Sequence, residues 1–123
     1  MSERETVLVV DDDIEILAAA TIRLKAAGYD TLTAADGQAG VALAEARQPD
    51  AILMDVNMPV KDGITALEEL KGIDSTQDIP VVIMSAKESN RQASYDAGAH
   101  AFLKKPYQGA KMVQAVTEAL EAA

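Results

Sequence analysis

The sequence predicts an α/β fold, a doubly wound parallel sheet of five strands covered by helices on both faces. Short runs of β-branched and other apolar residues alternate five times with segments of helical periodicity. This alternation is typical of β-α units joined by right-handed crossovers. Three of the runs, VLVV, AILM and VVIM, are apolar throughout, which indicates strands that are buried on both faces of a parallel sheet.

Each element is expected from its local pattern. Strands are predicted at 6–10, 29–34, 51–54, 79–84 and 100–104. Helices are predicted at 13–27, 37–47, 64–71, 88–97 and 107–121. Gly28 stops the first helix and Pro49 follows the second. The helix at 88–97 has a thin apolar stripe, so we expect it to pack weakly and to be the least anchored element.

The composition limits the classes of protein to consider. With 123 residues, of which 49% are hydrophobic, the chain is long enough for one domain with one core. It has no cysteine, which excludes disulfides, thiolate metal sites and cysteine nucleophiles. The net charge of −9 argues against a nucleic-acid surface, because such a surface is basic. Without a long apolar run or a signal peptide pattern, we expect a soluble cytoplasmic protein and no membrane contact.

Polar side chains follow four of the five predicted strands. They are Asp11, Asp12 and Asp13 after the first, Asp55 after the third, Ser85 after the fourth, and Lys104 and Lys105 after the fifth. The carboxyl ends of parallel strands meet at one edge, which is where ligands bind. Taken singly, these residues have structural explanations: Asp13 or Asp12 can cap the first helix, and Ser85 the fourth. Those explanations leave unexplained why the whole set meets at one edge.

The chemistry of this set indicates a phosphoryl site. Carboxylates within a few ångströms of one another repel, and burial raises their pKa values further. Mg²⁺ resolves the conflict, because it takes carboxylate, water and phosphate oxygens, whereas the lack of cysteine and the single histidine argue against zinc. Lys105 and the Ser85 hydroxyl would then contact phosphate oxygens. A carboxylate can itself attack a phosphoryl group and form an aspartyl phosphate.

Over almost its whole length the chain resembles a receiver domain of two-component response regulators, of the chemotaxis-regulator type. The segments VLVVDDD, ILMDVNMPVKDG, VVIMSA and AFLKKPY carry the resemblance. It implies the strand order 2-1-3-4-5. It also implies one receiver domain over residues 1–123, and because the sequence stops directly after the last predicted helix, we expect no output domain.

The resemblance also implies a role for individual residues. Asp11 and Asp12 correspond to the acidic pair that holds Mg²⁺ and Asp55 to the phosphoacceptor, while the backbone carbonyl of Asn57 completes the metal shell. Lys105 corresponds to the lysine of the site, which makes Lys104 a bystander, and its bond to Pro106 is typically cis.

The remaining implied roles concern the response to phosphorylation. Ser85 corresponds to the switch hydroxyl, and Phe102 to the switch aromatic residue that turns inward on activation. Asn57 and Lys87 stand where side chains influence the loss of the phosphoryl group. His100 is expected to be a surface or structural histidine.

The implied function is a phosphorylation switch that catalyses only its own phosphorylation and dephosphorylation. A histidine kinase or histidine phosphotransfer protein would donate to Asp55, and the fourth helix, fifth strand and fifth helix would then bind a downstream protein, as a monomer or a weak phosphorylation-dependent dimer. Two alternatives stay open. A haloacid-dehalogenase-like phosphatase also uses a strand-terminal aspartate with Mg²⁺, but it needs Asp-x-Asp where this chain has Asn57. The other alternative is a receiver that no longer accepts phosphate and acts as a constitutive adaptor.

Overall fold

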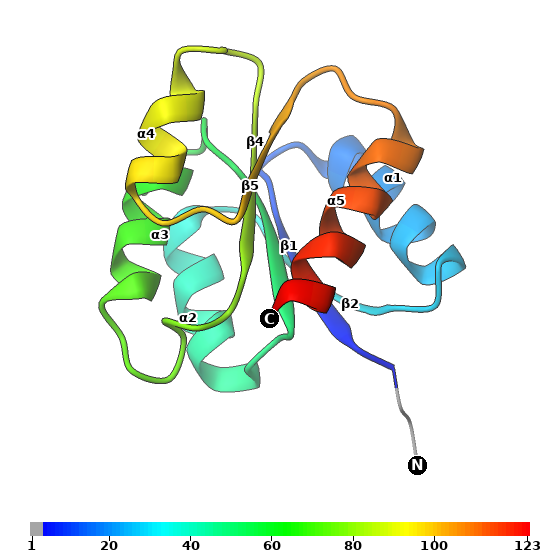
Figure 1. The fold of residues 1–123 in the computed structure, drawn as a ribbon, viewed down its shortest axis with the longest axis horizontal. Coiled ribbons are helices and arrows are strands. Elements are labelled where there is room, and N and C mark those ends of the chain that lie inside the picture. Colours follow the sequence, from blue (N-terminus) through cyan, green and yellow to red (C-terminus); the bar gives the residue numbers. More distant parts are fainter. Residues whose placement is uncertain (1–3) are drawn as a thin grey trace.

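The computed structural model describes residues 4–123 and confirms the predicted fold class (Figure 1). The strands are β1 (Thr6–Val10), β2 (Asp30–Ala34), β3 (Ala51–Asp55), β4 (Val81–Ser85) and β5 (Ala101–Lys104). The helices are α1 (Ile14–Ala26), α2 (Gly37–Arg47), α3 (Gly63–Lys71), α4 (Asn90–Asp96) and α5 (Gly109–Ala122). All neighbouring strands are parallel, and the sheet order is β2-β1-β3-β4-β5, the order that the resemblance implied.

The ends of the elements differ from the sequence prediction by at most two residues. The fourth strand begins at Val81 and not at Ile79, and Pro80, which precedes it, has no N–H for a strand ladder. The fourth helix is shorter at both ends than predicted, since it spans only Asn90–Asp96. The predicted stop of the first helix is confirmed, because Gly28 follows it with a left-handed φ of 103°.

The central strands are buried on both faces, as their apolar runs predicted. Leu8 and Val10 pack into one cluster with α2 and α3, whereas Val7 and Val9 pack into a second cluster with α1 and α5. Figure 1 shows these two helical layers on opposite sides of the sheet. Because side chains alternate between the faces of a strand, four successive apolar residues supply both cores.

Of the helices in the described residues, α4 is the one that hydrophobic packing anchors least. Ser94 is its one buried residue, whereas each of the other described helices buries at least one apolar side chain. The thin apolar stripe seen in the sequence therefore corresponds to a helix that polar contacts, and not hydrophobic burial, hold in place.

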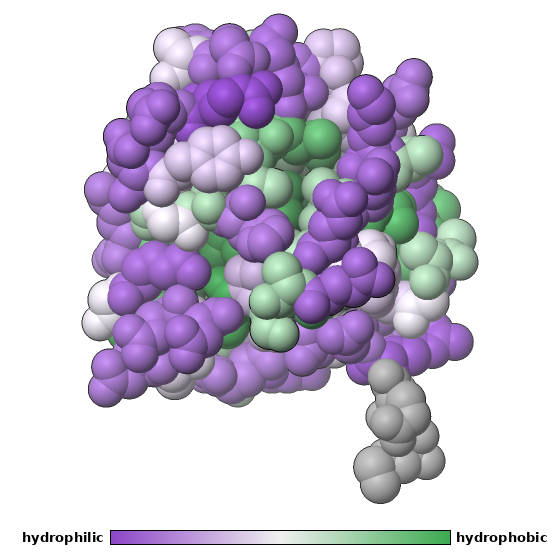
Figure 2. All heavy atoms as spheres, in the orientation of Figure 1, coloured by the Kyte–Doolittle hydropathy of each residue, from purple (hydrophilic) through white to green (hydrophobic). Residues whose placement is uncertain are grey.

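The surface seen in Figure 2 is mostly hydrophilic, with apolar residues visible in the middle of the view and at its right edge. Within the described residues, no helix combines the length and the apolar character that a bilayer span requires.

Candidate functional site

The sheet topology brings the polar strand ends together. The adjacent strands β1 and β3 pair Val10 with Met54, so the residues that follow this pair in the sequence, Asp11 and Asp55, lie side by side at the carboxyl edge. On the other side of β3, Ser85 ends β4 and pairs with Lys104 of β5. The edge therefore collects residues that are far apart in the sequence, as the fold prediction required.

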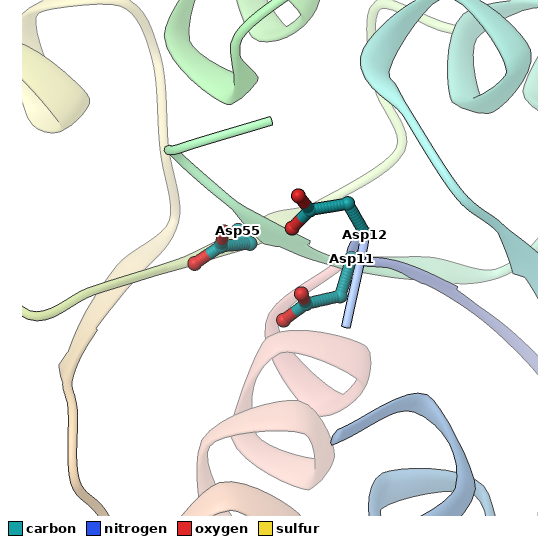
Figure 3. A group of neighbouring side chains, drawn as sticks. All are labelled: Asp11, Asp12 and Asp55. Carbon is teal, nitrogen blue, oxygen red and sulfur yellow. The ribbon is translucent and has the colours of Figure 1, made fainter. Parts of the chain in front are cut away.

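Three carboxylates meet at this edge (Figure 3). Asp11, Asp12 and Asp55 each offer one oxygen, and these oxygens lie within 4.8 Å of one another. Asp11 and Asp55 are only 1% and 5% exposed, whereas Asp12 is exposed. Burial raises the pKa of Asp55 and the charges of Asp11 and Asp12 raise it further, although a hydrogen bond from Lys105 opposes them.

The ammonium of Lys105 is the counter-charge of this cluster. Its Nζ lies 2.7 Å from Asp55 Oδ1 and 3.2 Å from Asp11 Oδ2. Burial alone would lower the pKa of Lys105, but the contacts with Asp55 and Asp11 outweigh burial, and the pKa is raised. The Lys105–Pro106 peptide bond is cis, and the Lys105 N–H donates to the Ser85 carbonyl at 2.8 Å. The neighbouring Lys104 is exposed.

The donor set fits Mg²⁺. Three carboxylates face one ammonium, so a divalent cation would supply the missing positive charge, and oxygen donors are the ligands that Mg²⁺ prefers. Asn57, whose carbonyl the resemblance implies as a further ligand, lies in the exposed loop two residues after Asp55. A metal at this position would be bound by Asp11, Asp12 and Asp55.

The third acid after β1 has a structural role. Asp13 is the N-cap of α1, and its carboxylate accepts from the N–H groups of Glu15 and Ile16 at 2.9 and 3.3 Å. The Asp13 N–H in turn donates to Asp11 Oδ1 at 3.0 Å. Of the two helix-capping candidates that the sequence offered, the structure selects Asp13. The cap also holds one oxygen of the buried Asp11.

Gly63, which the sequence analysis did not single out, lies directly behind Asp55. A Cβ on Gly63 would stand 2.1 Å from the Asp55 carbonyl oxygen, and the Gly63 N–H donates to the Val56 carbonyl at 2.9 Å. A glycine is therefore required where α3 begins against the end of β3. Its position in an Asp-Gly turn was the only signal in the sequence.

Ser85 is 1% exposed, and its hydroxyl accepts two hydrogen bonds. The donors are the Lys87 N–H at 3.1 Å and the Asn90 side-chain amide at 2.8 Å. The alternative that Ser85 caps the fourth helix is wrong, because the N-cap position belongs to Ser89, which makes no side-chain capping bond. Asn90 was not a candidate from sequence, since nothing in the pattern links it to Ser85.

Phe102 is 8% exposed and packs in the core. The guanidinium of Arg91 lies 4.7 Å from the centre of its ring, and the Phe102 N–H donates to the Tyr95 hydroxyl at 3.2 Å. Arg91 also forms an ion pair with Glu88. Two residues of α4 thus contact Phe102, and no pattern in the sequence indicates either contact. Lys87 and His100 are exposed.

A cleft of about 370 Å³ opens beside the cluster. Lys105 lines it together with Ile16 of α1, Ala86 after β4, and Pro106 and Tyr107 after β5. Its lining is mostly apolar, so this side of the site can accept an apolar surface next to a charged group.

Comparison with known proteins agrees with this geometry. The family model "Response regulator receiver domain" matches residues 7–117. The transcriptional regulatory protein PrrA of Mycobacterium tuberculosis is 41% identical over 112 residues, which are 89% of this chain and 47% of PrrA. The chain thus spans about half the length of the curated relatives that it matches.

Solved structures show the same fold. Chemotaxis protein CheY4 of Vibrio cholerae superposes with a TM-score of 0.89 at 30% identity, covering 94% of this chain and 98% of CheY4. The receiver domain of the sensor histidine kinase PA1611 of Pseudomonas aeruginosa, solved with a magnesium ion in its active-site cleft, gives 0.89 at 28% identity and covers 96% and 98%. This protein belongs to the response regulator receiver domain family, whose members are phospho-signalling switches.

Proposed function

We propose that this chain switches its binding to a downstream protein when Asp55 accepts a phosphoryl group from a phosphohistidine. The observation that supports this most strongly is the Asp55 carboxylate at the carboxyl edge, next to the acidic pair of Asp11 and Asp12 and within 2.7 Å of the Lys105 ammonium. The donor is a histidine kinase or a histidine phosphotransfer protein. The chain acts in the cytoplasm as a monomer or a weak phosphorylation-dependent dimer.

The proposed step is a displacement at phosphorus. A carboxylate oxygen of Asp55 forms a bond to phosphorus while the P–N bond to the donor imidazole breaks. The electron pair of that bond stays on the imidazole nitrogen, which takes up a proton. Asp55 must be ionised to attack, and the ammonium of Lys105 favours the ionised form because it donates a hydrogen bond to the carboxylate.

Bound Mg²⁺ would offset the negative charge of the phosphoryl oxygens and of the acids around it. Asp11, Asp12 and Asp55 would hold it, with the Asn57 carbonyl as the implied further ligand. Lys105 would turn from Asp55 to a phosphoryl oxygen as charge builds there, and the Ser85 hydroxyl would donate to another. The exposed side chains of Asn57 and Lys87 would influence how fast water removes the phosphoryl group.

The apolar cleft beside Lys105 supports docking of a protein donor. Ile16, Pro106 and Tyr107 line it, so a helix that presents phosphohistidine could pack there while the phosphoryl group reaches Asp55. A small donor needs no such contact and tests the chemistry of the site alone.

We propose α4, β5 and α5 as the readout face. A cleft of about 450 Å³ on this face is lined by three cationic residues, Arg91, Lys104 and Lys111, and by Phe102. The weak anchoring of α4 supports a movable element, and Phe102 links this helix to the strand β5. The phosphorylated state would bias an equilibrium between arrangements of this face.

The direct test is the intact mass of the protein after incubation with acetyl phosphate, with and without Mg²⁺, for wild type and Asp55→Asn. The proposal expects one added phosphoryl group on wild type, dependent on Mg²⁺, and none on the variant. Free phosphate is measured in the same samples.

Other outcomes identify the alternatives. Continuous phosphate release from varied phosphate esters would favour a phosphatase, although Asn57 stands where that class needs its second acid. The absence of an adduct with acetyl phosphate and with a panel of phosphorylated histidine kinases would overturn the proposal and favour a constitutive adaptor.

A further inference from the structure

The hydrogen-bonding capacity of the Ser85 hydroxyl is nearly used up. A hydroxyl has one proton and two acceptor lone pairs. Two donors, the Lys87 N–H and the Asn90 amide, already approach the oxygen at 3.1 and 2.8 Å. Only the hydroxyl proton is still free to form a hydrogen bond, and it must point away from both donors. Ser85 is thereby prepared to donate and not to accept.

An acceptor for this proton has to lie on the side of the hydroxyl that faces away from Lys87 and Asn90. Ser85 follows Met84, which pairs with Asp55 on the adjacent strand β3. A phosphoryl group on Asp55 would place new acceptor oxygens at that edge. The orientation that Asn90 and Lys87 impose on Ser85 therefore suits the phosphorylated form of the site.

The side chain of Asn90 does not serve its own helix. Asn90 is the first residue of α4 and follows the N-cap Ser89, so its side chain does not stand at the position from which asparagine caps a helix. Here its amide leaves the helix and donates to Ser85. Its backbone N–H donates instead to the Lys87 carbonyl at 3.0 Å.

Such a bond matters more for α4 than for any other described helix, because α4 buries no apolar side chain. Tyr95 and Arg91 also join this helix to the sheet through their contacts with Phe102 on β5. The helix is thus tied at its first residue to Ser85 and farther along to Phe102. A movement of Ser85 toward a phosphoryl oxygen must stretch, break or drag the Asn90 bond.

We propose that Asn90 is a positioning residue: its carboxamide orients the Ser85 hydroxyl as a donor and couples the position of Ser85 to α4. This inference rests on the proposed function, since it describes how a phosphoryl group on Asp55 is sensed. Asn90 touches no reacting atom and acts through Ser85.

The test compares wild type, Asn90→Ala and the control Gln92→Ala, each with and without acetyl phosphate and Mg²⁺. Gln92 is another side-chain amide of α4, and it bonds to Asp96 within the helix. Intact mass gives the adduct, and amide hydrogen exchange over residues 89–97 reports α4. In Asn90→Ala the exchange of unphosphorylated α4 should rise by about fivefold, the factor expected from the loss of one hydrogen bond.

The change in α4 exchange on phosphorylation shows whether Asn90 couples Ser85 to α4 or only stabilises the helix. In wild type and Gln92→Ala, phosphorylation should change the exchange of α4. In Asn90→Ala the adduct still forms, but this change should largely disappear. Adding Asn90→Ala to Ser85→Ala should then have no further effect on the response, because Asn90 acts through the hydroxyl.

A second experiment reverses the direction of the hydrogen bond between residue 90 and the Ser85 hydroxyl. Asn90→Asp has a carboxylate that cannot donate and would accept the Ser85 proton, so less adduct should accumulate than in Ser89→Asp. Ser89→Asp adds the same charge one residue earlier, at a side chain that makes no capping bond.

The two hypotheses fail differently. No adduct on wild type from acetyl phosphate or from phosphorylated histidine kinases would overturn the proposed function and the role of Asn90 with it. An adduct on wild type together with an unreduced α4 response in Asn90→Ala would overturn the role of Asn90 alone, as would additive effects of the Ser85 and Asn90 substitutions.

Discussion

The Lys105 ammonium contacts Asp55 at 2.7 Å and Asp11 at 3.2 Å, so one cation serves two buried carboxylates that are far apart in the sequence. This relationship sets the charge balance of the site. Desolvation opposes the ionisation of Asp55, while Lys105 favours it. Changes to either residue therefore alter stability and the chemistry of the site together.

Asp55→Asn is expected to raise the free energy of unfolding of the metal-free protein at neutral pH. Burial is the main reason that the pKa of Asp55 is raised above its usual 3.8. The folded state then binds more protons than the unfolded state, so stability falls as pH rises from 3.8 through the raised pKa. The amide of Asp55→Asn stays uncharged, so the variant does not lose this stability as the pH rises.

Urea denaturation in EDTA, from about pH 4 to 8, measures this difference. The gap between Asp55→Asn and wild type should widen as pH rises. A variant that is less stable than wild type at every pH would show that the ion pair with Lys105 outweighs the burial of Asp55.

Lys105→Met is expected to destabilise the metal-free protein at neutral pH by about 2–4 kcal/mol, because it leaves buried carboxylates without a counter-charge. The pKa of Lys105 is raised above 10.5, so the stabilisation by this lysine is present below pH 10.5 and is lost as pH rises through the raised pKa. Lys104→Met, at the exposed neighbour, should change stability by no more than about 0.5 kcal/mol. Equal losses of stability in the two variants would contradict the conclusion that Lys105 is the counter-charge of the buried carboxylates.

Mg²⁺ is expected to raise the melting temperature, since it binds the folded state; a free concentration about 100-fold above Kd would add about 2.7 kcal/mol. Asp12→Asn should reduce this gain while hardly changing the metal-free protein, because Asp12 is exposed and belongs to the acidic cluster. The control is Asp13→Asn, which keeps a good helix cap and should keep the full gain. Thermal scans with MgCl₂ and with EDTA measure the rise in melting temperature for each variant. A full rise in Asp12→Asn would show that the ion binds elsewhere.

Gly63→Ala is expected to destabilise the protein by about 3 kcal/mol, because the added Cβ would stand 2.1 Å from the Asp55 carbonyl oxygen. Gly72→Ala is the matched control. Its Cβ would meet nothing closer than 3.5 Å, and its φ is −91°, so it should be neutral or stabilise by up to about 1 kcal/mol. Similar unfolding free energies for the two variants would refute the close approach behind Asp55.

The fold and the main site follow from the sequence because both depend on local patterns. Apolar runs locate the strands, and parallel topology then brings every strand end to one edge, so the proximity of Asp11, Asp55 and Lys105 needs no knowledge of side-chain packing. The strand order came from the resemblance, since alternation alone does not determine it.

The remaining features depend on side chains that meet across loops. The bond from Asn90 to Ser85, the Arg91 guanidinium over Phe102 and the space behind Asp55 that only Gly63 can leave are all products of the folded geometry. No periodicity encodes them. The ends of α4 also differ from the prediction, because a helix with a thin apolar stripe gives little signal of where it begins or ends.

The loop after Asp55 carries backbone strain that a last substitution can test. Val60 has a φ of 70°, a left-handed conformation that costs a β-branched residue about 1–2 kcal/mol. Its side chain is 75% exposed, so its removal sacrifices little packing. Val60→Gly should therefore stabilise the protein by up to about 1 kcal/mol, after the entropy that glycine loses on folding is subtracted.

The matched control is Ile22→Gly, which removes another exposed β-branched side chain, 68% exposed, but from within the helix α1. There glycine relieves no strain and should cost about 0.5–1 kcal/mol. Urea denaturation of both variants gives the comparison. If both lose stability, the left-handed conformation of Val60 does not cost the folded protein the expected free energy. If Val60→Gly gains stability yet forms less aspartyl phosphate, the strain helps to hold the loop in the geometry that the acceptor needs.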